Sequence, residues 1–188
     1  MAKLFTIKKT IKLGRVRLIK LSILIFCGFL GLSSNSFANT PGEVLVGASL
    51  PDATLNGFSG NTKKFSAYRG KPLIINVWAS WCGPCREEIG SLERLSRRFG
   101  GKQLNVIGIS TDDDANAAAA FIKESNLTFT NYLDSNVRLE NMLGANTIPL
   151  TILVDGHGRI IEKIRGFQDW DNPETIKFIN QKLHLKLK

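Results

Sequence analysis

The chain has 188 residues and a formal net charge of +9, from 25 basic and 16 acidic residues. Seven of the basic residues lie within residues 1–20, a stretch that contains no acid. The remaining 18 basic and 16 acidic residues nearly balance, which argues against a nucleic-acid-binding protein. Four lysines crowd the C-terminal end and fit a solvated helix face and tail: Lys177, Lys182, Lys186 and Lys188.

The N-terminal segment has the three parts of a secretory signal peptide. Its basic start is followed by a largely apolar run at residues 21–32 and then by small, polar residues. Ser36 and Ala38 supply a small-x-small cleavage pattern, so we expect residues 1–38 to be removed after Ala38. The apolar run is shorter than the ~20 residues of a transmembrane helix. An uncleaved anchor is the alternative, and Phe26 before Cys27 argues against a lipoprotein.

Removal of this segment leaves residues 39–188, which suffice for one domain with a single packed core. Only two cysteines remain, and both belong to the motif Trp-Cys-Gly-Pro-Cys at residues 81–85. No spare thiol is then present to mispair in an oxidising compartment. The sequence therefore predicts a periplasmic or otherwise extracytoplasmic domain, which would contact a membrane only through an uncleaved N-terminal segment.

A β-hairpin and a buried strand are predicted ahead of the motif. Residues 53–55 and 63–65 flank the sequence Gly-Phe-Ser-Gly-Asn at 57–61, whose composition favours a turn. Residues 73–78 are nearly continuously apolar, which is typical of a central strand that is covered on both faces. Asn76 is the polar exception in this strand.

The Cys-x-x-Cys pair, Cys82 and Cys85, indicates a redox site. It lies where the predicted strand turns directly into a helix that should end near Phe99. The Cys82 thiol would face the free N–H groups of the first helical turn, where the helix dipole favours a thiolate. Pro84 suits this turn because its missing N–H costs nothing there. We expect an exposed, attacking Cys82 and a buried Cys85 that resolves the mixed disulfide.

Two other readings of the motif are weaker. A zinc site needs four protein ligands, or three and a water molecule. The only other Cys and His residues are Cys27, His157 and His184, so we expect no metal. A permanent structural disulfide is disfavoured, because so short a loop constrains the unfolded chain little. Trp81, just ahead of the first cysteine, is expected to cover the site rather than to belong to the core.

Residues 76–88 read Asn-Val-Trp-Ala-Ser-Trp-Cys-Gly-Pro-Cys-Arg-Glu-Glu, and residues 147–151 read Thr-Ile-Pro-Leu-Thr. Together they resemble the thioredoxin superfamily, and in particular its exported TlpA/ResA-like branch. The resemblance implies an α/β thioredoxin fold, with a mixed central sheet flanked by helices and an N-terminal β-hairpin extension. It also implies a thiol:disulfide oxidoreductase with no cofactor beyond a redox-active disulfide between Cys82 and Cys85.

The same resemblance implies a substrate-binding groove beside the disulfide. The peptide bond between Ile148 and Pro149 should be cis and face the cysteines, although cis is a minority state of X–Pro bonds in general. With Trp81, Gly83 and Pro84, these two residues are expected to shape a groove in which substrate backbone binds in extended form.

Glu88 is the candidate for proton transfer. Many thioredoxins place a buried carboxylate at the position of Asn76, and an amide cannot act as a base. Glu88 lies three residues after Cys85 and therefore on the same helix face, and ResA-like proteins carry a glutamate at this spacing. The alternative is a solvent-facing glutamate that the helix dipole stabilises.

Further elements follow the motif helix. An apolar strand at 104–110 should run parallel to the first strand, with a right-handed crossover. We interpret Asp112, Asp113 and Asp114 as the cap and first-turn acids of a helix at 115–125, rather than as a cation site. The remaining predicted elements are a short helix at 136–143, strands at 150–154 and 159–165, and a final helix from 173 to about 183.

The sequence also predicts the direction of the reaction. Gly83 and Pro84 add neither a cation nor a side-chain donor that would over-stabilise a thiolate, so the reduction potential should lie nearer ~−270 mV than ~−120 mV. We expect a reductant of exported proteins or apocytochrome, kept reduced by a membrane thiol electron donor. A reductant dedicated to cytochrome c maturation would typically carry an acid where Leu150 follows the proline. A copper chaperone or copper-site assembly protein would usually space its cysteines by three residues and add a distal histidine, and this sequence shows neither feature.

Overall fold

The computed structural model describes residues 41–188, and the predicted signal peptide lies outside them. The strands are β1 Thr54–Gly57, β2 Thr62–Lys64, β3 Leu73–Trp78, β4 Asn105–Ser110, β5 Thr130–Leu133, β6 Leu150–Val154 and β7 Ile160–Arg165. The helices are the 3-10 helix η1 Phe65–Tyr68 and the α-helices α2 Gly83–Phe99, α3 Ala115–Glu124, α4 Arg138–Leu143 and α5 Pro173–Leu183. Within residues 41–188, every helix is too short or too polar to cross a bilayer.

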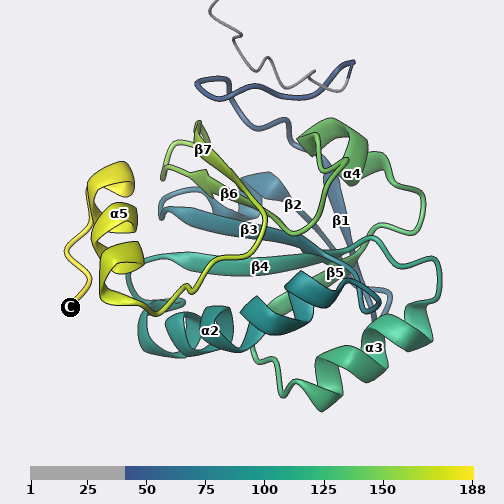
Figure 1. Ribbon diagram of the computed structural model, residues 1–188. Helices are drawn as coiled ribbons and strands as arrows, with labels where there is room; N and C mark the ends of the chain where they lie inside the picture. Colours follow the sequence, from purple (N-terminus) through teal and green to yellow (C-terminus); the bar gives the residue numbers. More distant parts are fainter. Residues whose placement is uncertain (1–40) are drawn as a thin grey trace, which may run out of the picture. The chain divides into compact units, whose positions relative to one another are not determined.

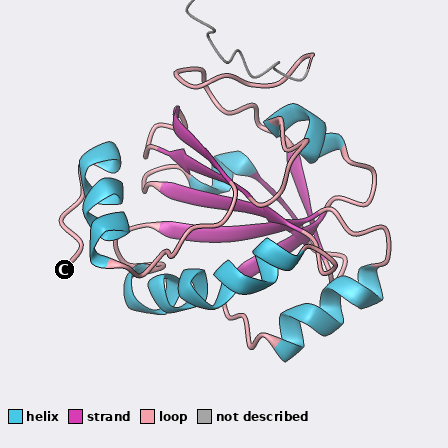
Figure 2. Ribbon diagram, viewed as in Figure 1, coloured by secondary structure: helices cyan, strands magenta, loops and turns pink. Residues whose placement is uncertain are grey.

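All seven strands belong to one mixed sheet, in the order β2-β1-β5-β4-β3-β6-β7 (Figure 1). The central strand β3 pairs in parallel with β4 and antiparallel with β6. Its odd-numbered residues pack in a cluster with η1 and α4, whereas Ile74 and Trp78 pack with α2, α3 and α5. Helices lie on both sides of the sheet (Figure 2). Asn76 is also even-numbered, and successive side chains of a strand point to opposite faces, so its side chain points toward α2 as those of Ile74 and Trp78 do.

Helix α2 covers its face of the sheet with side chains at helical spacing. Cys85, Ile89, Leu92, Leu95 and Phe99 are buried, and intervals of three and four residues place them on one stripe of the helix. The unit β3–α2–β4 joins two parallel strands, so the carboxyl ends of β3 and β4 lie at the same edge of the sheet. The motif begins at this edge, where α2 starts.

The predicted fold is confirmed. The sheet is mixed, helices cover both faces, and β1 and β2 form the N-terminal hairpin, which joins the sheet through β5. Two boundaries differ from the sequence analysis. Helix α4 begins at Arg138, because Val137 before it has a left-handed backbone with φ of 48°. Asp114 alone caps α3, accepting a hydrogen bond from the Asn116 N–H at 2.8 Å. The first turn contains no acid, so the interpretation of Asp112 and Asp113 as cap or first-turn acids is wrong.

Gly108 in β4 gives a test of the packing behind the motif. The Trp78 indole donates to Asn131 Oδ1 at 3.1 Å, and a Cβ at Gly108 would overlap Asn131 Oδ1 and lie 2.7 Å from Trp78 Nε1. We expect Gly108→Ala to lower the free energy of unfolding by about 1–3 kcal/mol in urea denaturation. Gly90→Ala, within α2 and with only the Arg94 side chain nearby, should raise it by about 0.5–1 kcal/mol. Equal stability of Gly108→Ala and wild type would contradict this packing.

Candidate active site

The two cysteines of the motif form a disulfide at the N-terminus of α2. Their Cα atoms are 5.3 Å apart. Cys82 is the N-cap residue of α2, and its Sγ accepts a hydrogen bond from the Cys85 N–H at 3.3 Å. Pro84 lies in the first turn, where its missing N–H leaves no donor unsatisfied. The positive end of the helix therefore points at the Cys82 sulfur, an environment that stabilises a thiolate.

The disulfide is less accessible than the sequence suggested. Cys82 is 5% exposed and Cys85 is fully buried, so the prediction of an exposed Cys82 is wrong for the disulfide form. Both sulfurs belong to an apolar cluster with Trp78 and Ala79, and Ile148 packs against this cluster. Cys82 is nevertheless the more accessible of the two sulfurs, as an attacking thiol requires.

The residues expected to bind substrate come from the start of α2 with the turn before it, and from the segment before β6. The bond between Ile148 and Pro149 is cis, as the resemblance implied, and Ile148 packs against the cluster that contains both cysteines. Trp81 is 71% exposed, which excludes it from the core, and Gly83 and Pro84 are also exposed. The structure thus offers apolar groups to solvent beside the disulfide. Their part in substrate binding stays a prediction.

Glu88 is fully buried one helical turn behind Cys85, so the alternative of a solvent-facing glutamate is wrong. Its Oε1 accepts a hydrogen bond from Asn76 Nδ2 at 2.7 Å. Its Oε2 accepts one from the Gln168 N–H at 2.9 Å. Asn76 Nδ2 also donates to Thr151 Oγ1 at 2.9 Å. The Glu88 carboxyl group therefore connects α2 to β3, β6 and the loop after β7.

Burial raises the pKa of Glu88 to about 7, and the donors around it oppose this rise. These donors are the Asn76 amide, the Gln168 N–H and the indole of Trp170, although the indole lies outside hydrogen-bonding geometry. A carboxyl group with such a pKa takes up and releases a proton near neutral pH. The site thus places one exchangeable proton on the helix face that carries Cys85.

Thr151 and Gln168 were not recognised as parts of the site from the sequence. Thr151 lies in the strand after the cis proline, and its residue type indicates only a strand. Gln168 contributes its backbone N–H, which no side-chain pattern reveals. Only the packing of the loop after β7 against α2 shows that Glu88 has this partner.

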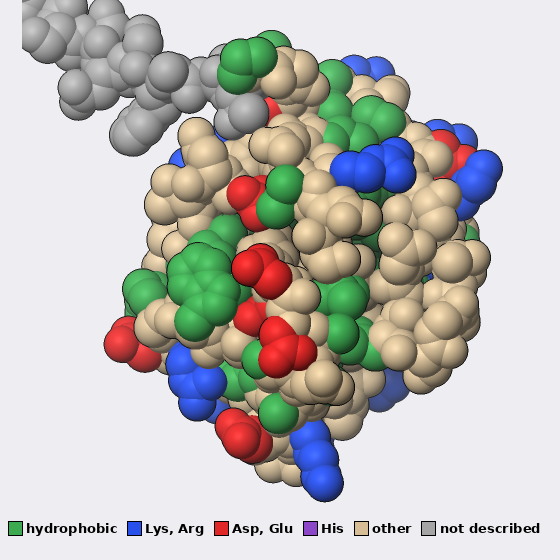
Figure 3. Space-filling view, turned by 90° about the vertical axis from the view of Figure 1, so that its right-hand side faces the viewer, with side chains coloured by type: hydrophobic (Ala, Val, Ile, Leu, Met, Phe, Trp, Pro, Cys, Tyr) green, Lys and Arg blue, Asp and Glu red, His purple; other side chains and the backbone are tan. Residues whose placement is uncertain are grey.

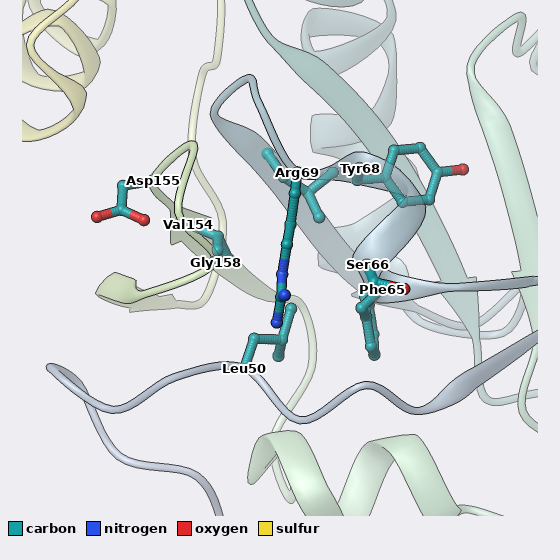
Figure 4. A pocket seen from close by; sticks show the side chains of 9 residues that line it. Leu50, Phe65, Ser66, Tyr68, Arg69, Val154, Asp155 and Gly158 are labelled. Atoms are coloured by element: carbon teal, nitrogen blue, oxygen red, sulfur yellow. The ribbon is translucent and has the colours of Figure 1, made fainter.

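A small cavity elsewhere in the structure offers no alternative site. Its lining includes Leu50 from the segment before β1, Tyr68 from η1 and Gly158 from the turn between β6 and β7 (Figure 4). Its volume is about 10 Å³, which is room for about one water molecule. It adjoins Leu73 at the start of β3, whereas the disulfide follows the end of this strand.

Comparison with known proteins identifies the family. The Redoxin family profile matches residues 45–179. The chain belongs to the Redoxin family. A thiol-disulfide oxidoreductase ResA of Bacillus cereus is 26% identical over 148 residues, which cover 78% of this chain and 85% of that protein. ResA of Geobacillus thermodenitrificans is 26% identical over 153 residues, which cover 80% of this chain and 88% of that protein.

Solved structures of similar proteins share the fold. A putative thiol:disulfide interchange protein DsbE from Chlorobium tepidum has a TM-score of 0.68 and 25% identity, covering 74% of this Redoxin chain and 99% of its own. A thiol-disulfide oxidoreductase from Bacteroides fragilis has a TM-score of 0.62 and 28% identity, covering 70% and 99%. The chain is a ResA-like member of the thioredoxin superfamily and a thiol–disulfide oxidoreductase.

The raised pKa of Glu88 predicts a pH-dependent stability. The folded protein holds this proton up to about pH 7, whereas the unfolded chain releases it near 4.5, so stability falls as pH rises through this interval. Between pH 5 and pH 8 the free energy of unfolding of the disulfide form, measured by urea denaturation, should fall by about 2–3 kcal/mol. Glu88→Gln should not show this fall, because glutamine does not titrate. Glu87→Gln, at an exposed neighbour, should keep the wild-type pH dependence. The same pH dependence in Glu88→Gln and wild type would contradict a buried, titrating Glu88.

Proposed function

We propose that this protein is an extracytoplasmic reductant of protein disulfides. The observation that supports thiol–disulfide exchange most strongly is the position of Cys82 as the N-cap of α2, with the Cys85 N–H directed at its sulfur. The reducing direction is inferred from Gly83 and Pro84, which add no group that over-stabilises a thiolate. In the reduced protein the same N–H groups stabilise a Cys82 thiolate, which is the attacking species in thiol–disulfide exchange. The names of the ResA relatives agree with this activity.

The reaction proceeds in two exchanges. The Cys82 thiolate attacks one sulfur of a substrate disulfide, the substrate S–S bond breaks, and the other substrate sulfur leaves as a thiolate. Cys85, as a thiolate, then attacks the Cys82 sulfur of the mixed disulfide and releases the second substrate thiolate. Two electrons pass from the dithiol to the substrate, both substrate thiolates take protons from water, and the Cys82–Cys85 disulfide forms. No cofactor takes part.

Glu88 assists the second exchange. Cys85 has to lose its proton before it can attack, and it is fully buried, away from bulk water. Glu88 on the same helix face, with its pKa raised to about 7 by burial, accepts this proton and returns it to solvent after the exchange. The amide of Asn76 cannot take the proton, but its hydrogen bond holds the acceptor oxygen in place.

The proposed location and partners follow from the sequence. Residues 1–38 have the pattern of a cleaved signal peptide, and the two cysteines that remain are the redox pair. Disulfide-containing exported proteins are then the substrates, and a membrane thiol electron donor regenerates the dithiol. Leu150 after the cis proline disfavours a role restricted to cytochrome c maturation. The two-residue spacing of the cysteines disfavours a copper chaperone or copper-site assembly protein.

A trapping experiment tests this reaction and its location together. Cys85→Ser should still attack substrate but stall as a mixed disulfide, because no second thiol is present to resolve it. Adducts captured in cells should appear on non-reducing gels, disappear with dithiothreitol, and contain exported proteins identified by mass spectrometry.

Cys82→Ser is the matched control, because it keeps Cys85 but lacks the accessible sulfur, and it should accumulate no adduct. Adducts on Cys82→Ser instead of Cys85→Ser would mean that the nucleophile is assigned to the wrong sulfur. Adducts with cytoplasmic proteins alone would contradict the location. Tight Cu(I) binding without reduction of insulin by the wild type would favour the copper-binding alternative.

A further inference from the structure

Asp112 has a different environment from the two aspartates that follow it. It comes directly after Thr111, at the edge where β3 and β4 end side by side, and the Thr111 N–H donates to the Trp78 carbonyl at 2.9 Å. Asp112 is 2% exposed, whereas Asp113 and Asp114 are exposed. A carboxylate at such a depth needs partners, and the residues just ahead of the motif supply them.

The carboxylate of Asp112 binds the loop that leads into the active site. Its Oδ2 accepts a hydrogen bond from the Ser80 N–H at 2.9 Å, and its Oδ1 accepts one from Ser80 Oγ at 2.6 Å. The Ser110 hydroxyl donates to Oδ2 at 2.7 Å. On the other side of the loop, Arg86 donates from Nη1 to the Ser80 carbonyl at 3.1 Å. Ser80 is therefore held between Asp112 and α2.

This loop determines the position of the nucleophilic sulfur. Ser80 lies two residues before Cys82, and the Cys82 N–H donates to the Ala79 carbonyl at 3.1 Å, so residues 79–82 form a tight turn. Two Cα steps of at most ~3.8 Å each separate Ser80 from Cys82. The hydrogen bonds to Ser80 thus hold the Asp112 carboxylate against the turn that leads to the sulfur of Cys82.

The charge of Asp112 opposes the helix dipole. The N-terminus of α2 stabilises a Cys82 thiolate, and a nearby anion destabilises it. The first turns of α2 also carry Arg86, which stacks over the Phe121 ring at 4.8 Å, the exposed Glu87 and the buried Glu88. Other acidic side chains lie over the middle of the face where α2 begins (Figure 3). Salt screens the charges of the acidic side chains that are exposed to solvent, whereas it screens the charge of the buried Asp112 much less.

We propose that Asp112 is a positioning residue of the redox site: its carboxylate fixes the Ser80 turn, and its charge keeps the Cys82 thiolate from being over-stabilised. A less stable thiolate makes the dithiol a stronger reductant, because the reduced state is less favoured. The inference rests on the proposed reductant function and extends it. It assigns the reducing character to a residue outside the Cys-Gly-Pro-Cys sequence.

Asp112→Asn tests the proposal, because asparagine keeps the shape and can still accept from the Ser80 N–H. In a Cys85→Ser background, the Cys82 pKa from the pH dependence of alkylation should fall by about one unit. In the intact dithiol, the equilibrium constant with glutathione should shift about 3- to 10-fold toward the reduced protein, or about 15–30 mV. Asp112→Ser, which also keeps an acceptor, gives the same comparison if Asp112→Asn does not fold.

Two controls separate charge from structure. Asp113→Asn removes an exposed charge next to Asp112, and should change the glutathione equilibrium less than about two-fold because of screening. Ser80→Ala removes one hydrogen bond but keeps the Asp112 charge, and should leave the Cys82 pKa within about 0.3 units.

The outcomes distinguish this inference from the proposed function. An Asp112→Asn protein with a lower melting temperature but a wild-type pKa and equilibrium would show that Asp112 is only structural. A raised Cys82 pKa in Asp112→Asn would equally overturn the proposal. A strongly oxidising wild type would instead contradict the reductant function. The difference between wild type and Asp112→Asn would still measure the effect of the Asp112 charge.

Discussion

The backbone N–H groups in the first turn of α2 have no helical partners, and the site depends on how the chain satisfies them. The chain leaves the buried strand β3 and enters α2 within a few residues, so these donors point at the edge of the sheet. Cys82 is the N-cap and its sulfur accepts one of the N–H groups. The fold thereby brings a polarisable, ionisable sulfur to the positive end of a helix dipole.

Two buried carboxyl groups, Glu88 and Asp112, lie on the elements that position this sulfur pair. Glu88 lies behind Cys85, and its protonation near neutral pH follows from burial. Asp112 lies at the carboxyl end of β4 and is tied to the turn before Cys82. In the mechanism that we propose, one group carries a proton to and from the resolving thiol, and the other opposes the thiolate of the attacking thiol. Under this proposal, the balance between the helix dipole and the Asp112 charge sets the direction of exchange.

The parts of the site that sequence predicts are the local ones. The apolar run of β3, the cysteine spacing and Pro84 in the first turn depend on neighbouring residues, so strand, helix and redox pair could be inferred. The buried Glu88 carboxyl group accepts a hydrogen bond from the Gln168 N–H, 80 positions away. No sequence pattern predicts that contact. Asp112 was misread because a run of aspartates before a helix favours capping. Its partner Ser80 follows the end of β3, which lies parallel to β4 in the sheet but far from Asp112 in the sequence.

The reduction potential of the wild-type dithiol tests the central claim most directly. The potential follows from equilibration with glutathione buffers of known ratio, with the reduced fraction read by alkylation and mass spectrometry. A dithiol whose thiolate is stabilised by the α2 dipole but limited by Asp112 should lie nearer the ~−270 mV of thioredoxin. A value near the ~−120 mV of strongly oxidising periplasmic proteins would contradict the account.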